Sequence, residues 1–406
     1  MTDAPGLLWN QIDDNYTRLG SLEGLSHIDA IAACNSLAPW SQMRRLNLLD
    51  DGNIGAICGG VNSCYSDTDV ETRGQCMVNI ENFEYYTDFT TEGVYIWYIR
   101  PKGGDETVEG EDVTFKTFPA FIRNGVTKDR IFPSAFEGYV NTELSSIYGG
   151  DVLESKAGVQ PTSSHTIAQF RAAAHARNGG AAGKWEIMDY LTMCAVQWLY
   201  LIKYGGSNSQ TLLGAGVTNI TDDVNKIENR AINTGATASL GNTSGTVTVE
   251  HYLTGESTVQ TSFNGIESFY GNIQKFVDGI NLDSTYSPWI ADHGFTSVFT
   301  GSPIPALSTP YVNSNLTVSP THGYITDIAT DPTYDFGFLA KTVSSDPKSV
   351  LKYICDSHNV STLGNRPVRM GGGWHSNLSA GTFEFYADKT SAVSDREIGA
   401  RLMYVG

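Results

Sequence analysis

Residues 370–406, at the end of the chain, hold a run of mixed polar residues between two rigid pieces, and few folds can accommodate such a segment. It reads MGGGWHSNLSAGTFEFYADKTSAVSDREIGARLMYVG and opens on three glycines and a tryptophan. Glycines let a backbone pass close to its neighbours, and Trp374 can anchor the segment by burying a large ring. The fold must therefore bury both ends of this segment and leave its middle at the surface.

Alternation within the segment separates expected core from expected surface. In GTFEFYA, Phe383 and Phe385 fall on one face of a strand, whereas Glu384 and Tyr386 fall on the other. The closing strand places four apolar residues on one face: Ile398, Ala400, Leu402 and Tyr404. We expect these apolar residues to form core and the changing polar residues to point outward.

Composition indicates a turn-rich protein with substantial β structure, since the chain has 42 glycines and 20 tyrosines together with many Ser, Thr and Asn residues. Its 406 residues suit one large domain with a small accessory domain. The net charge of -18 argues against binding to nucleic-acid backbones or anionic membrane surfaces, both of which need a basic face.

Membrane insertion and secretion are not expected. No run of about 18 apolar residues occurs, which is the length that a spanning helix needs. The first residues, MTDAPGLLWNQIDDNY, lack the basic and apolar regions of a secretory signal. We therefore expect synthesis in a cytoplasm, with any release by another route, such as packaging into a virus particle freed by lysis.

The cysteines, histidines and acidic loops offer only weak metal signals. Six cysteines occur without a CxxC pair, so buried free thiols are expected rather than a metal or disulfide set. His165 and His175, in a helical stretch, are expected to be surface or capping groups. Calcium binding by the acidic loops DVETRG and DPTYDFG stays open, although neither has the spacing of an EF-hand loop.

Catalytic motifs with a defined spacing are missing from the sequence. It has no GxxxxGK[ST], no GxGxxG opening a helix after a strand, no HExxH and no GxSxG. A pair of carboxylates for glycoside hydrolysis stays open because acidic residues are plentiful, but nothing singles one pair out.

Periodicity places several elements along the chain. Residues 1–78 are expected to be an accessory region that contains a helix capped by Ser26, followed by a strand with an Asp51-Gly52 turn. A strand is expected at 94–99, and two short strands around Asn124-Gly125. Two helices follow, one capped by Ser163 or Ser164 and one over 184–204. The second helix places Ile187, Leu191, Cys194 and Trp198 on one apolar stripe.

Residues 219–365 are expected to be a β-rich insertion of short strands and frequent turns. Within it, GIESFYGNIQKFVDGINL at 265–282 is predicted to be a packed loop or short strand.

Three pieces of the sequence occur in an order that resembles a known family. They are GIESFYGNIQKFVDG, RMGGGWHSNLSAGTF and REIGARLMYV. This order resembles the C-type lectin fold of the formylglycine-generating-enzyme type, and is most similar to the variable proteins of diversity-generating retroelements, which include phage tropism determinants. The resemblance covers about residues 79–406 and implies an α+β chain with two helices, short antiparallel strands, the β-rich insertion and the small N-terminal domain.

The resemblance also implies a function. It points to a non-enzymatic receptor-binding protein of a phage tail, carried on the virion, and to a homotrimer that contacts a host cell-surface receptor and other tail proteins. The region 1–78 would then attach and trimerise the chain, and 370–401 would be the segment that a retroelement diversifies. A surface of Tyr, His, Asn, Ser and Arg side chains has the adaptable hydrogen bonding and aromatic contact area of a paratope.

The ligand-binding residues implied by this resemblance all lie in the C-terminal segment: Trp374, His375, Ser376, Asn377, Leu378, Glu384, Tyr386, Asp388, Lys389, Asp395 and Arg396. In such retroelements adenines of a template copy are mutated, and AAC codons are the main targets. Seven positions fit that chemistry best: His375, Ser376, Leu378, Tyr386, Asp388, Asp395 and Arg396. Lys389, Glu384 and Glu397 would need other template codons.

Two alternatives to receptor binding stay open. Only Asn377 remains as an asparagine in the segment, so the chain is either a heavily diversified copy or an undiversified tail or assembly protein with the same motifs. An oxidase of the formylglycine-generating type would need a cysteine pair near the C-terminal motif, and no cysteine follows Cys355. We therefore expect no catalysis and no cofactor.

Overall fold

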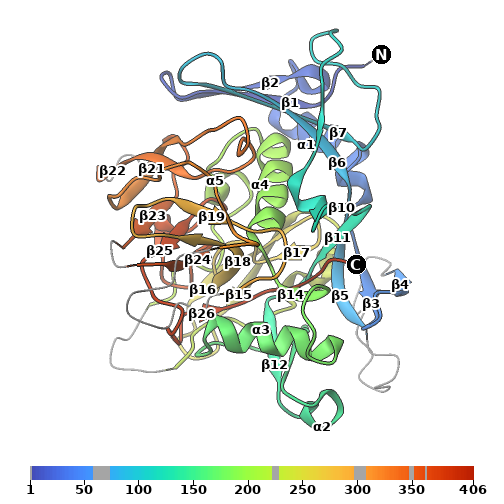
Figure 1. Cartoon of the computed structure of the whole chain (residues 1–406), viewed down its shortest axis with the longest axis vertical. Helices are drawn as coiled ribbons and strands as arrows, with labels where there is room; N and C mark the ends of the chain where they lie inside the picture. The colour runs from blue at the N-terminus through green and yellow to red at the C-terminus, as the bar shows by residue number, and fades with distance from the viewer. Residues whose placement is uncertain (1, 58–73, 222–227, 297–307, 347–351, 362–363) are drawn as a thin grey trace.

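The computed structural model of the chain describes residues 2–57, 74–221, 228–296, 308–346, 352–361 and 364–406 (Figure 1). The strands among these residues form three larger sheets and three small ones. At one end of the molecule lies a five-stranded antiparallel sheet in the order β2, β1, β7, β6, β8. Its strands span Asn15–Leu19, Gly6–Asn10, Val94–Pro101, Phe83–Asp88 and Lys116–Thr117. The aromatic and β-branched sequence of β7 confirms the strand expected at 94–99.

A six-stranded sheet runs through the part of the chain where a domain boundary was expected. Its order is β14, β27, β11, β5, β3, β4. The strands span Trp185–Ile187, Leu402–Tyr404, Arg130–Pro133, Gln75–Glu81, Arg44–Leu48 and Ile54–Ile57. The expected boundary between residues 78 and 79 falls inside β5, which pairs with β3 before it and β11 after it. The role of residues 1–78 as an attachment region stays a prediction.

The largest sheet carries the C-terminal motifs. It runs β20, β19, β18, β24, β25, β23, β21, β22, and β26 pairs with β18 outside this path. In that order the strands span Val312–Asn313, Pro288–Ile290, Gln274–Leu282, Arg366–Met370, Phe385–Ala387, Ser357–Val360, Gly323–Ile328, Ala340–Ser344 and, for β26, Ile398–Gly399. All nine residues of β18 are buried. Within the stretch 265–282, the predicted packed loop and short strand are found at residues 266–273, whereas residues 274–282 form a central strand instead. The region 219–365 supplies much of the largest sheet.

Three small sheets complete the described β structure. One contains β15 (Gly245–Glu250), β16 (Ser257–Phe263) and β17 (Ile266–Glu267), and one joins β12 (Gly138–Asn141) to β13 (Val152–Ser155). The third is the hairpin of β9 (Ile122–Arg123) and β10 (Val126–Thr127). Its turn residues Asn124 and Gly125 have φ of 49° and 73°, the left-handed values that a two-residue turn of this kind needs, which confirms the predicted turn.

Five short α-helices lie among the described residues: α1 His27–Ser36, α2 Ser145–Tyr148, α3 Ile167–His175, α4 Tyr190–Tyr204 and α5 Ser209–Leu212. The Ser26 cap of α1 is confirmed, since its side chain accepts the Asp29 N–H. The cap predicted for α3 was wrong by two or three residues, because Thr166 and Gln169 form a capping box there.

The helix predicted over 184–204 is a strand followed by a helix. Residues 185–187 form β14, and Asp189 then caps α4 by accepting the Thr192 N–H at 2.7 Å. Ile187 therefore does not belong to the helix. Every residue of α4 is buried, so the expected single apolar stripe was also wrong. Figure 1 shows α4 between the sheets, where Trp198 lies edge-on to Tyr85 with ring centroids 5.2 Å apart.

The expected fold class, an α+β C-type lectin fold with two helices, is contradicted by this architecture. Among the described residues, strands make up 34% and helices 17%, and the strands form several largely antiparallel sheets. Short strands separated by turns give a weak periodic signal, whereas the two apolar helices give a strong one. The helix at 184–204 was therefore predicted too long, and core strands within 219–365 were predicted to belong to an insertion.

Candidate ligand-binding surface

Six buried side chains, five of them polar, hold the C-terminal motifs in place, and we refer to these six as the framework. They are Asn272, Asp278, Arg369, Trp374, Glu384 and Arg401. Arg401 donates to the carbonyl of Ser134 at 2.7 Å and to those of Glu267 and Ser268. The two oxygens of Asp278 accept from Arg171 Nε and Nη2 at 2.8 and 2.9 Å. These bonds satisfy groups whose burial would otherwise be costly.

Two buried carboxylates fix the ends of the 372–384 loop. Glu384 accepts the Gly372 N–H and the Gln274 Nε2–H, and burial raises the pKa of its carboxyl to about 7. Asp356 accepts the Phe383 N–H at 2.6 Å, and burial raises its pKa well above the ordinary value. The expectation that Glu384 points outward was wrong, because its side chain closes the loop from the inside.

Gln274 joins three separate parts of the site. Its side chain donates to Glu384 and accepts from Arg369, and its backbone N–H donates to the carbonyl of Glu397 at 3.0 Å. Gln274 is a functional residue that was not predicted from the sequence. Its position two residues after Asn272, in the first of the three motifs, is the one signal that could have identified it.

Glycine is required at the start of the loop. Gly372 has φ of 72°, and a Cβ there would lie 2.5 Å from the Ala380 Cβ. The predicted close approach of the backbone is thus confirmed at this position. Trp374 beside it is fully buried against Val217, Ile220 and Ile273, so it anchors the loop and is not part of the exposed surface.

The remaining predicted residues lie at or near the surface. Asn377, Leu378 and Lys389 are exposed, and six others are partly buried: His375, Ser376, Tyr386, Asp388, Asp395 and Arg396. Trp374 and Glu384 are the two predicted members that the structure buries.

Contacts link four of these surface residues into two groups. In the first, His375 Nε2 lies 3.7 Å from a Glu397 oxygen, and the loop at Asn377 is held by Gln210 Nε2, which donates to the Asn377 carbonyl at 2.7 Å. In the second, the guanidinium of Arg369 binds Asp388 and lies over the Tyr386 ring at 5.8 Å.

Two further residues contact these groups without having been predicted. The Ser357 hydroxyl lies 3.2 Å from the Tyr386 hydroxyl, and Asn359 pairs with Tyr386 across the parallel strands β23 and β25. Strand pairing of this kind joins residues far apart in the sequence, so no local pattern indicates it. The surface therefore extends from the C-terminal segment onto β23.

The structure describes only some of the cysteines and acidic loops considered as free thiols or calcium ligands. Cys34, Cys76, Cys194 and Cys355 are buried, as expected, whereas Cys58 and Cys64 lie outside the described residues. In the loop DPTYDFG, Asp335 accepts from the Tyr85 hydroxyl and from Lys116 Nζ, both at 2.6 Å. The loop DVETRG lies outside the described residues except for Gly74. Calcium binding stays a prediction.

Comparison with known proteins adds no assignment. No family model matches the chain, and no curated protein matches it. Within the part of the chain that the structure describes, the helices are too short or too polar to cross a lipid bilayer.

Proposed function

We propose that this chain is a non-enzymatic receptor-binding protein of a bacteriophage tail, which contacts host cells through its C-terminal surface. The observation that carries the proposal is the division within residues 370–401. Buried residues such as Trp374 and Glu384 fix the backbone, while Asn377, Leu378 and Lys389 are exposed. A rigid scaffold that presents replaceable side chains is what a recognition surface requires.

The resemblance to variable proteins of diversity-generating retroelements extends the proposal. The exposed and partly buried positions would be those that the retroelement changes, and several copies on one virion, as a homotrimer, would compensate weak single contacts by avidity. Carriage on the virion follows from the same resemblance. Sequencing the DNA beside the gene tests it, because a reverse-transcriptase gene and a near-copy of the segment differing only at adenines are expected there.

The described thiols support a non-enzymatic function. Burial raises the pKa of Cys34, Cys76 and Cys355 to about 12, whereas a cysteine that performs chemistry needs a lowered pKa. An oxidase acting through these cysteines is therefore disfavoured.

Competition for adsorption tests receptor binding directly. Purified chain in excess is expected to block adsorption of the phage to its host bacterium. A variant with His375, Leu378, Tyr386 and Lys389 replaced by alanine, and with Asn377 replaced by glycine to suit its φ of 51°, should unfold at nearly the same temperature and fail to block. A matched control, Tyr252→Ser with Leu253→Ser, alters exposed apolar residues elsewhere and should still block. If the alanine variant blocks as well as the parent, the proposed surface is wrong, and a structural role in the particle becomes the better explanation.

A further inference from the structure

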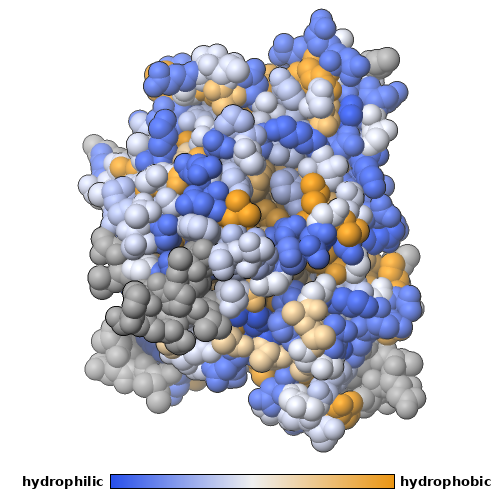
Figure 2. Space-filling view, viewed as in Figure 1, coloured by the Kyte–Doolittle hydropathy of each residue, from blue (hydrophilic) through white to orange (hydrophobic). Residues whose placement is uncertain are grey.

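A cavity of about 430 Å³ opens beside the β9–β10 hairpin and the last strand of the chain, and shares no residue with the C-terminal surface. Its apolar lining comes from Val126, Phe295, Met403 and Val405. Figure 2 shows hydrophobic side chains gathered on this face near β10 and the C-terminus, within a mainly hydrophilic surface. The volume lies in the range of small-molecule sites, which are usually apolar with a few oriented polar groups.

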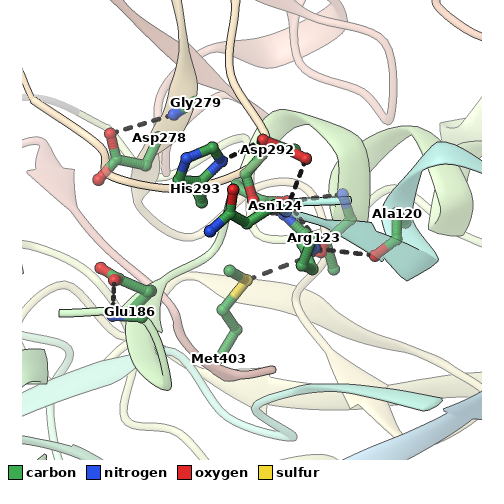
Figure 3. Close-up of polar contacts among 12 residues, drawn as sticks. Ala120, Arg123, Asn124, Glu186, Asp278, Gly279, Asp292, His293 and Met403 are labelled. Carbon is green, nitrogen blue, oxygen red and sulfur yellow. Dashed lines mark hydrogen bonds and ion pairs between the residues drawn. The ribbon is translucent and has the colours of Figure 1, made fainter. Parts of the chain in front are cut away.

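Polar groups from three separate segments face this cavity (Figure 3). His293 Nδ1 lies 2.5 Å from one oxygen of Asp292, and the other oxygen accepts the Asn124 N–H at 2.9 Å. When Nδ1–H donates to Asp292, Nε2 is left as a hydrogen-bond acceptor. The Asn124 side-chain amide points into the space between His293 and Glu186, and it has no hydrogen-bond partner among the described residues.

Glu186 supplies fixed acceptors at the opposite side. Its Oε2 lies 2.5 Å from His175 Nε2, and its Oε1 accepts the Gly183 N–H at 2.7 Å. Each carboxylate oxygen keeps a second lone pair, so the group can accept further bonds without moving. Contacts of this kind orient a polar group before a ligand arrives.

The charges that line the cavity balance one another. Arg123 and Lys128 are the cations, and Glu186 and Asp292 are the carboxylates. Arg123 is already bound by Asp189 and by the carbonyls of Ala120 and Asp292, so it offers no open anion site. A ligand with a large net charge would meet no complementary potential here. Acceptors on Glu186 and His293 lie beside donors on Lys128 and the Asn124 amide, so the polar groups of a ligand must both donate and accept hydrogen bonds, as hydroxyl groups do.

We propose that this cavity binds a neutral, polyhydroxylated ring compound of monosaccharide size. The apolar face of the ring would pack on Phe295 and Met403, and its hydroxyl groups would donate to Glu186 and His293 and exchange bonds with the Asn124 amide. The site is independent of the proposed receptor-binding surface, since the two share no residue.

Saturation-transfer NMR on the full chain with glucose, galactose, mannose and N-acetylglucosamine tests the proposal. At least one sugar is expected to receive saturation, and Asn124→Gly and His293→Ala should each weaken its binding about five- to tenfold, the effect of losing one or two hydrogen bonds. Asn124→Gly removes the amide without straining the backbone, because Asn124 has φ of 49°. Both variants should unfold at nearly the parent temperature.

The controls separate this site from the other surface. His375→Ala with Tyr386→Ala should leave sugar binding unchanged. Absence of saturation for all four sugars would overturn the proposal, as would a signal that survives in the Asn124→Gly, His293→Ala double variant. Binding of acetate or of methylammonium in place of the sugars would overturn the assignment of a neutral ligand.

Discussion

The framework and the surface above it use the same residue types in opposite ways. Arg401 and Asp278 are polar side chains whose bonds are made entirely inside the protein. Asn377 and Lys389 are polar side chains that the C-terminal segment exposes to solvent. Polarity alone therefore does not mark a binding surface, and burial decides which polar residue holds the fold.

The difference explains how a variable surface can coexist with a stable fold. A buried charge that loses its partner is strongly destabilising, whereas surface substitutions usually change stability by less than about 0.5 kcal/mol. Replacement at Leu378 or Lys389 should thus be tolerated, and replacement in the framework should not.

Breaking the Arg171–Asp278 pair should have the largest effect. Arg171→Met leaves the buried Asp278 carboxylate without its two bonds at 2.8 and 2.9 Å. We expect a loss of about 3–5 kcal/mol in the free energy of unfolding, measured by urea denaturation. The double variant Arg171→Met, Asp278→Asn removes the stranded charge and should recover part of the loss. If the free energy of unfolding of Arg171→Met lies within about 1 kcal/mol of the parent value, the ion pair does not stabilise the framework.

Adding a methyl group at Gly372 should have the next largest effect on the free energy of unfolding. Gly372→Ala combines an unfavourable φ of 72° with a contact of 2.5 Å to Ala380. Strain and overpacking together should cost about 2–4 kcal/mol in urea denaturation. Gly149 is a matched control, because it has the same φ of 72° and a Cβ there would have nothing within 4 Å. Gly149→Ala should cost only about 1 kcal/mol, and equal losses in both variants would exclude the contact as the cause.

Local signals predicted local elements well. The Ser26 cap, the Asn124-Gly125 turn and the strand at 94–99 depend on a few adjacent residues, and the structure confirms all three. The burial of a side chain by strands that are distant in the sequence could not be predicted. Glu384 alternates with Phe383 and Phe385 as a surface residue would, but Gln274 and Gly372 enclose it.

The same limit applies to the site as a whole. The need for glycine at Gly372 and the exposed positions were predicted from motifs within one segment, residues 370–401. Gln274 and Asp356, which reach that segment through the tertiary fold, were not predicted. The cavity lined by Asn124, Glu186 and His293 draws on three regions that no single motif connects.

Protonation of Glu384 should make the free energy of unfolding depend on pH. The folded state raises its pKa from 4.5 to about 7, because burial disfavours the charged form. Because the pKa is raised, the contribution of the protonated Glu384 carboxyl to the free energy of unfolding is complete below pH 4.5. This contribution is lost as the pH rises through about 7. The parent should therefore lose roughly 3 kcal/mol relative to Glu384→Gln between these values, since one pKa unit corresponds to about 1.4 kcal/mol.

Paired urea titrations of the parent and Glu384→Gln at several pH values measure this change. The glutamine variant keeps an acceptor for the Gly372 N–H, so it should stay folded and serve as the reference without a charge. A difference between the two proteins that stays constant across this pH range would contradict a raised pKa at Glu384.

Substitution at the exposed positions should have the smallest effect on stability and a large one on adsorption. Leu378 is 54% exposed, and Lys389 is also exposed. Leu378→Ser with Lys389→Ser should change the free energy of unfolding by less than about 0.5 kcal/mol in urea. The same variant should compete poorly for phage adsorption, because an exposed apolar side chain at the centre of a contact contributes more to binding than to folding. A stability loss above about 1.5 kcal/mol would place these residues with the framework, and undiminished competition would remove them from the receptor-binding surface.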